Sequence, residues 1–194
     1  MIIEKAKRIL IAILSFRQAG FWRDDETLWL HTLEVNGKSW TAEDNLGQAL
    51  ARQGRREEAV ARFERALEIR PRDARAQYNL GTTLDELDRT GEAIPHLERA
   101  VELDPMDLPS RENLAIALLR ADRVEEAEAN LRRALAIDPD AWLAHYYLAG
   151  ALDRLGRTDE VIEQLHETLR LRPGFRPAQK DLEAVLAARG AEGK

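Results

Sequence analysis

The sequence predicts an all-α protein, built as an array of antiparallel helix pairs and closed by one C-terminal helix. Three observations predict this fold. The segment "LERAVELDP" at 97–105 returns at a fixed spacing of 34 residues, as "FERALEIRP" at 63–71 and "LRRALAIDP" at 131–139. Within each unit, apolar residues recur at i, i+3, i+4 and i+7, which gives a helix one buried face. Each copy ends at a proline, which cannot continue a helix.

The composition limits what such an array can do. The chain has 194 residues, of which 33% are charged and 44% hydrophobic, enough apolar material for a substantial core. Its formal net charge of −6 disfavours nucleic-acid binding, because phosphate contacts need an excess of Lys and Arg on one face. The chain has no cysteine, which excludes disulfides, zinc–thiolate sites and thiol catalysis.

Residues 1–39 are predicted to form a divergent helix pair with an apolar first helix. The apolar run 9–16 follows a basic segment and is far shorter than the roughly 20 residues needed to cross a bilayer. No clear cleavage site follows it, which disfavours a signal peptide. The sequence favours a buried helix, and the alternatives are a membrane-surface anchor or the trimmed end of a longer hydrophobic segment. The candidate assembly or membrane contacts are Ile9, Ile13 and Phe16.

The regular part of the array follows. Four repeats are predicted, at 40–73, 74–107, 108–141 and 142–175. Small residues such as Ala93 and Ala100 stand where the two helices of a pair must approach closely. A stack of helix pairs leaves an apolar face open at its end, so a cap is required. Residues 176–194 therefore read as a C-terminal capping helix and a short tail.

The repeats resemble the tetratricopeptide repeat family. The likeness rests on the Leu-Gly pairs at 46–47 and 80–81, the two alanine positions of the first three repeats and the terminal proline at a period of 34 residues, whereas the fourth repeat departs with Val161 and Thr168. The resemblance implies a right-handed superhelical solenoid. It also implies a non-enzymatic protein–protein interaction scaffold that binds an extended peptide or a partner protein in its concave groove.

One polar position recurs on the predicted concave face, at Asn45, Asn79 and Asn113. A side-chain amide both donates and accepts, so a ladder of Asn residues suits the main chain of an extended peptide. The alternative is that these amides bond to neighbouring helices and serve only the stack. Together with side chains that would contact the peptide's own residues, the candidate peptide-binding residues are Asn45, Asn79, Asn113, Tyr78, Arg120, Tyr146 and Tyr147.

No catalytic residue, metal site or cofactor site is predicted. The four histidines do not pair at i and i+4, no Gly-rich phosphate loop is present, and no Ser lies in a nucleophile elbow. The carboxylates gather at helix starts, where they favour the helix dipole. The expected partner is therefore a protein or a peptide.

A second, shorter resemblance involves residues 21–47. They are similar to the junction before the repeat tail of bacterial polytopic glycosyltransferase-like membrane proteins, on Trp22, Leu28, Trp29, Thr32 and Trp40. This resemblance implies an extracytoplasmic, non-catalytic tail. A further alternative is a self-assembling protein that forms oligomers or filaments by end-to-end stacking. The sequence favours a cytoplasmic protein, with an extracytoplasmic or membrane-associated place in a bacterium as the alternative.

Overall fold

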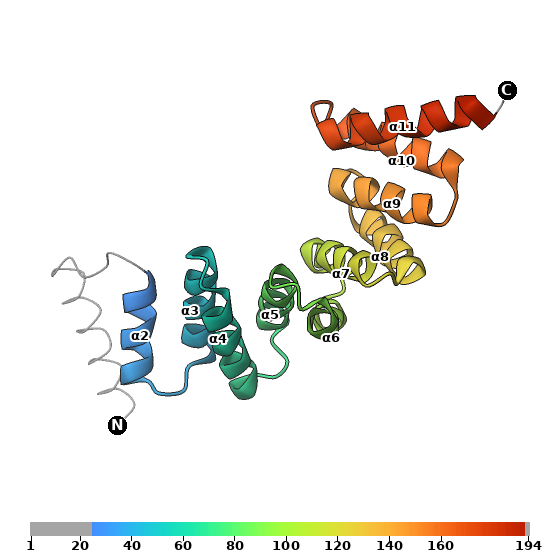
Figure 1. Cartoon of the computed structure of the whole chain (residues 1–194). Helices are drawn as coiled ribbons and strands as arrows, with labels where there is room; N and C mark the ends of the chain where they lie inside the picture. The colour runs from blue at the N-terminus through green and yellow to red at the C-terminus, as the bar shows by residue number, and fades with distance from the viewer. Residues whose placement is uncertain (1–24, 193–194) are drawn as a thin grey trace. The chain divides into compact units, whose positions relative to one another are not determined.

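The structure is a computed structural model that describes residues 25–192. The chain divides into two compact units, residues 1–87 and residues 88–194. All regular secondary structure in the described residues is α-helical (Figure 1). The predicted all-α solenoid of helix pairs is thereby confirmed.

Unit 1 consists of α2 (Asp25–Val35), α3 (Trp40–Arg52), α4 (Arg56–Ile69) and α5 (Ala74–Glu86). Each helix packs against its neighbour in the chain, and α3 also contacts α5. Figure 1 shows α3 and α4 side by side. The candidate contacts Ile9, Ile13 and Phe16 lie outside the described residues, so their assembly or membrane role stays a prediction.

Unit 2 consists of α6 (Thr90–Leu103), α7 (Leu108–Arg120), α8 (Val124–Ile137), α9 (Trp142–Arg154), α10 (Thr158–Leu171) and α11 (Arg176–Glu192). The helices again pack in chain order, and α7 also contacts α9. The last helix, α11, is the predicted C-terminal cap, and it buries Ala178 and Leu182. The division between the units falls between α5 and α6, inside the predicted repeat 74–107. The repeat boundaries stay a prediction.

Side-chain caps explain where several first helices begin. Ser39, Asp73 and Asp107 each accept a hydrogen bond from the backbone N–H three residues later, at 3.3, 3.0 and 2.9 Å. Such caps satisfy donors that have no partner in the first turn of a helix. They begin α3, α5 and α7.

The second helices begin differently, with an arginine that reaches forward to a glutamate in the first turn. The pairs are Arg55–Glu58, Arg89–Glu92, Arg123–Glu126 and Arg157–Glu160, at 2.6–2.8 Å. The residue before each arginine has a positive φ of 59–81°, at Gly54, Asp88, Asp122 and Gly156. Glycine adopts this conformation freely and Asp tolerates it. A left-handed residue followed by an Arg–Glu pair therefore joins the two helices of a repeat.

Small residues occupy buried positions on the second helices. The two alanine positions of each regular repeat are at most 1% exposed, at Ala59, Ala66, Ala93, Ala100, Ala127 and Ala134. In the fourth repeat Val161 and Thr168 take their places and are also buried. None of the helices formed by residues 25–192 is long and apolar enough to cross a membrane.

Candidate functional site

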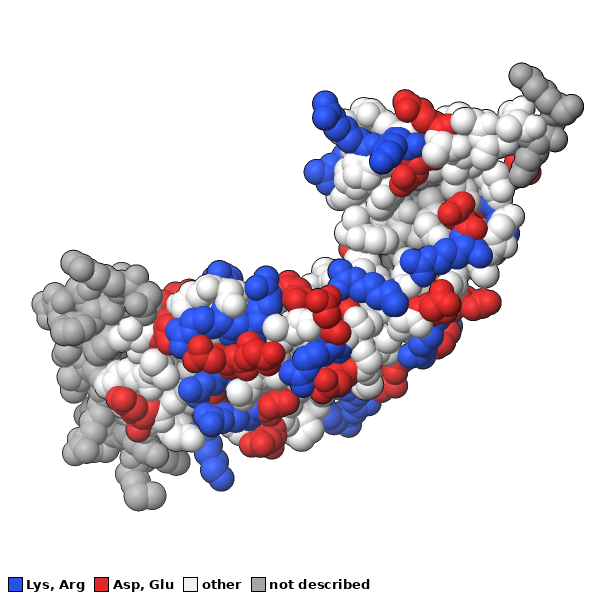
Figure 2. All heavy atoms as spheres, in the orientation of Figure 1, with Lys and Arg blue, Asp and Glu red and all other residues white. Residues whose placement is uncertain are grey.

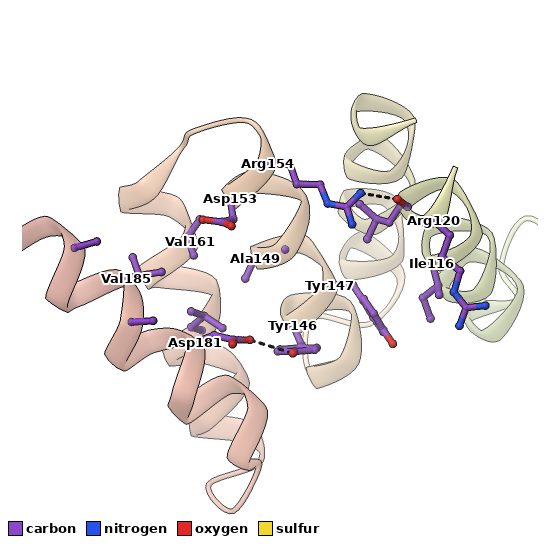
Figure 3. Close-up of a pocket in the computed structure, with 15 residues that line it drawn as sticks. Ile116, Arg120, Tyr146, Tyr147, Ala149, Asp153, Arg154, Val161, Asp181 and Val185 are labelled. Atoms are coloured by element: carbon purple, nitrogen blue, oxygen red, sulfur yellow. Dashed lines mark hydrogen bonds between the residues drawn. The ribbon is translucent and has the colours of Figure 1, made fainter. Parts of the chain in front are cut away.

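A cavity of about 660 Å³ opens in unit 2 between the first helices α7, α9 and α11. Its floor includes Val161 and Leu165 of α10, which are 3% and 1% exposed. Figure 3 shows side chains from the surrounding helices that point toward this space. The volume falls within the range of roughly 300–1,000 Å³ found for ligand pockets.

A row of aromatic rings leads to one wall of the cavity. The ring of Trp142 meets the ring of Phe175 edge-on at 5.0 Å, and Phe175 meets Tyr146 at 5.0 Å. Tyr146 then lies 5.6 Å from Tyr147, also edge-on. At the far end of the row, the guanidinium of Arg172 stacks over Trp142 at 4.2 Å. Each ring in this row packs against a neighbouring ring, which limits its side-chain freedom.

Tyr146 also joins two of the helices that line the cavity. Its hydroxyl donates to Oδ2 of Asp181 at 3.0 Å, which connects α9 to α11. Burial of the ring, and after it the hydrogen bond to Asp181, raises the pKa of Tyr146 to about 12. The phenol therefore stays protonated near neutral pH and remains a hydrogen-bond donor.

The rim of the cavity carries charges of both signs, from Arg120, Asp153, Arg154 and Asp181. Nη1 of Arg154 donates to the backbone carbonyl oxygen of Leu119, which connects α9 to α7. On the face shown in Figure 2, acidic and basic side chains are intermixed over unit 1. Broader uncharged areas lie over α9 and α11 on the same face. The cavity thus has an apolar floor, an aromatic wall and a mixed polar rim.

Comparison with known proteins decides the family. Two profiles described as tetratricopeptide repeat match the chain, at residues 39–106 and 118–186, and together they cover well over half of it. The chain is a tetratricopeptide repeat protein. The resemblance seen in the sequence is therefore confirmed for the repeats. The weaker resemblance of residues 21–47 to a membrane-protein junction stays a prediction.

Solved structures of other tetratricopeptide repeat proteins are similar in fold. The crystal structure of YrrB, described as a TPR protein with an unusual peptide-binding site, is 23% identical, has a TM-score of 0.75 and covers 91% of this chain and 88% of its own. A crystal structure of MamA is 25% identical, has a TM-score of 0.75 and covers 79% of this chain and 84% of its own. A structure of MamA from residue 41 to its end, from Desulfovibrio magneticus RS-1, is 24% identical and has a TM-score of 0.75. It covers 88% of this chain and 97% of its own. Comparison with curated proteins gives no match.

The structure of this repeat protein divides the predicted peptide-binding residues among different places. Arg120, Tyr146 and Tyr147 line the cavity of unit 2. Tyr78 and Asn79 line a second cavity of about 450 Å³ in unit 1. Asn45 and Asn113 line neither cavity, and the amide of Asn113 donates to the carbonyl oxygen of Pro109 in its own helix at 3.0 Å.

Asn79 is bonded to a buried carboxylate of the preceding repeat. Its Nδ2 donates to Oδ1 of Asp44 at 2.9 Å, and Asp44 is 0% exposed. Gln48 donates to Oδ2 of the same carboxylate at 2.8 Å, and Arg75 lies 2.8 Å from that oxygen. The contacts of Asn79 and Arg75 with Asp44 connect α3 to α5, so the amide nitrogen of Asn79 contributes to the stack of helices.

The burial of the Asp44 carboxylate leads to a prediction about how the stability of the protein depends on pH. Burial raises the pKa of Asp44 above its ordinary value, against the opposing effects of Asn79 and Arg75. The folded state then binds a proton at Asp44 more readily than the unfolded chain does. Protonation of Asp44 therefore adds to the free energy of unfolding. This contribution is fully present below the unfolded-state pKa of about 3.9, and it is lost as the pH rises through the folded-state pKa.

The unfolding free energy of the wild type relative to Asp44→Asn should therefore increase as the pH falls from neutral toward about 4. Urea unfolding of both chains at a series of pH values measures this difference. The other carboxylates are common to both chains, so most of their titration cancels in this difference. A difference that stays constant or shrinks toward acid pH would contradict the raised pKa.

Several residues of the unit 2 cavity were missed by sequence reasoning, among them Gly150, Ala184 and Val185. The repeat period could have identified them as residues of the cavity. Ile116, Gly150 and Ala184 are spaced 34 residues apart, so they occupy one position on three successive first helices. Among residues 25–192, no group of three His, Asp or Glu side chains is placed to hold a metal ion.

Proposed function

We propose that this protein is a non-enzymatic interaction scaffold that binds a peptide segment of a partner protein in the unit 2 cavity. The observation that carries the proposal is the meeting of Arg120, Tyr146 and Tyr147 at one cavity of ligand-binding size. Arginine and tyrosine are enriched among the residues that dominate binding energy at protein interfaces. A tyrosine held by its neighbours also loses little side-chain freedom on binding.

Two comparisons support the proposal. Stacked helix pairs of repeat proteins create extended concave surfaces, and repeat proteins use them for binding. YrrB, which shares the fold, is described as having a peptide-binding site. The partner is to be identified by pull-down with the full chain followed by mass spectrometry. Synthetic peptides that tile the partner then locate the bound segment.

Tyr147→Ala is expected to weaken binding of the located peptide about tenfold, because tyrosine is enriched among the interface residues whose removal costs the most binding energy. Tyr147 is partly exposed and its ring lies against Tyr146, so the fold should survive the change. His166→Ala is the matched control, because His166 is exposed on α10 and does not line the cavity. Fluorescence anisotropy of a labelled peptide measures both variants. Equal affinity for Tyr147→Ala and wild type would place the peptide elsewhere.

The role of the Asn ladder is tested separately. Asn79→Ala is expected to lower the unfolding free energy by about 1 kcal/mol, because its hydrogen bond to the buried Asp44 is lost. The affinity for a peptide in the unit 2 cavity should stay unchanged. A lost peptide affinity with an unaltered melting temperature would instead support a backbone-gripping role for Asn45, Asn79 and Asn113.

A further inference from the structure

Gly150 stands in the interior of α9, exposed and facing the unit 2 cavity. Glycine weakens a helix interior, because it loses more conformational freedom than other residues on folding. A Cβ atom added at Gly150 would meet nothing within 4 Å. The packing of the protein therefore gives no reason for a glycine at this position.

Gly47, another glycine inside a first helix, shows the contrast. A Cβ atom there would lie 2.6 Å from the ring of Phe63, so the close approach of α3 and α4 requires the missing side chain. Gly150 has no such neighbour. Its effect is to leave open the space in front of the α9 backbone.

The surroundings of this opening have a definite chemistry. Tyr147, Gly150 and Arg154 are spaced i, i+3 and i+7, so they lie along one face of α9. The apolar floor at Val161 and Leu165 lies beneath the same cavity. Ile116 and Val185, which are partly exposed, line the cavity as well, so an apolar side chain placed over Gly150 would contact an aromatic ring and aliphatic carbons.

Arg154, at one end of this face of α9, has N–H groups that are available to a ligand. Arg154 uses Nη1 for the carbonyl of Leu119 and lies 3.7 Å from Asp122. Its remaining guanidinium N–H groups make no hydrogen bond to the described residues 25–192. Arg120 lines the same cavity, and its acidic lining residues are Asp153 and Asp181, of which Asp181 already accepts the hydrogen bond of Tyr146. A carboxylate of a bound segment would find complementary charge here.

We infer that Gly150 is a ligand-contact position, where a partner segment carrying a bulky apolar side chain next to an acidic residue comes close to the backbone of α9. The inference rests on the proposed function and specifies the ligand of the same cavity. Glycine is the residue that permits such close approach of a ligand to a backbone.

The test uses peptides selected from a displayed random library against the full chain. The selected sequences are expected to share a Leu, Ile, Met or Phe within two residues of an Asp or Glu. For a labelled peptide of this kind, Gly150→Leu should weaken binding about tenfold or more, because its side chain fills the space. Gly150→Ala should raise the melting temperature and weaken binding less. Gly91→Ala is the control, since Gly91 is helical, exposed and open but lies on α6, away from the cavity.

The outcomes separate this inference from the proposed function. If Tyr147→Ala weakens the peptide but both Gly150 variants bind like wild type, the inference fails and the proposed function stands. If neither Tyr147→Ala nor Gly150→Leu affects binding, both fail. Selected sequences without a bulky apolar residue would also overturn the inference. Replacing the peptide's Asp or Glu by the amide should weaken binding, and unchanged affinity would overturn the acidic part.

Discussion

Phe63→Ala is expected to lower the free energy of unfolding by about 3–5 kcal/mol, the usual cost of removing a buried phenylalanine. The side chain is 1% exposed, and its ring faces the backbone of α3 at Gly47. Alanine would remove most of this apolar contact and leave a cavity between α3 and α4. Urea unfolding of the full chain, followed by circular dichroism, measures the loss.

Phe175→Ala is the matched comparison. Phe175 is half-buried, and its ring meets Trp142 and Tyr146 at its edges. Because part of its surface already faces water, its removal should cost clearly less. Equal losses for the two variants would show that Phe63 does not hold α3 against α4 in the way its burial indicates.

The second large effect is expected at Gly47. A Cβ atom at this position would lie 2.6–2.9 Å from three ring carbons of Phe63, whereas carbon atoms pack best at about 3.5–4.0 Å. Overpacking of this kind costs about 1–3 kcal/mol, and better helix propensity returns at most about 1 kcal/mol. Gly47→Ala should therefore destabilise the protein by about 1–2 kcal/mol. Gly91→Ala, where a Cβ meets nothing within 4 Å, should not destabilise it.

The other repeats suggest how to restore the lost stability. At the positions of Gly47 and Phe63, the third repeat has Ala115 and Leu131. Both are 0% exposed, so a larger first residue accompanies a smaller second one. Gly47→Ala should consequently cost less in a chain that also carries Phe63→Leu. A double-mutant cycle measures this coupling, and strictly additive costs would contradict a steric conflict with the ring.

The candidate site was predictable from the sequence only in part. Arg120, Tyr146 and Tyr147 were predicted because the 34-residue repeat period assigns each of them to the first helix of a repeat. Gly150 was missed because it has no side chain to signal a contact, and it contributes to the site by leaving space in the cavity. The space beside a glycine is either filled by a neighbouring ring, as at Gly47, or left open, as at Gly150. Which of the two occurs depends on residues of other helices.

The sequence by itself determined the helices and their order. The 34-residue period, the apolar stripe and the terminal prolines act within a few turns of chain, where local geometry decides the outcome. The tertiary structure alone decided which partners the polar groups take. Asn79 bonds to Asp44, a residue 35 positions earlier, and Tyr146 bonds to Asp181, a residue 35 positions later. A hydrogen bond and a cavity depend on distances between side chains of different repeats, and only the packed helices set those distances.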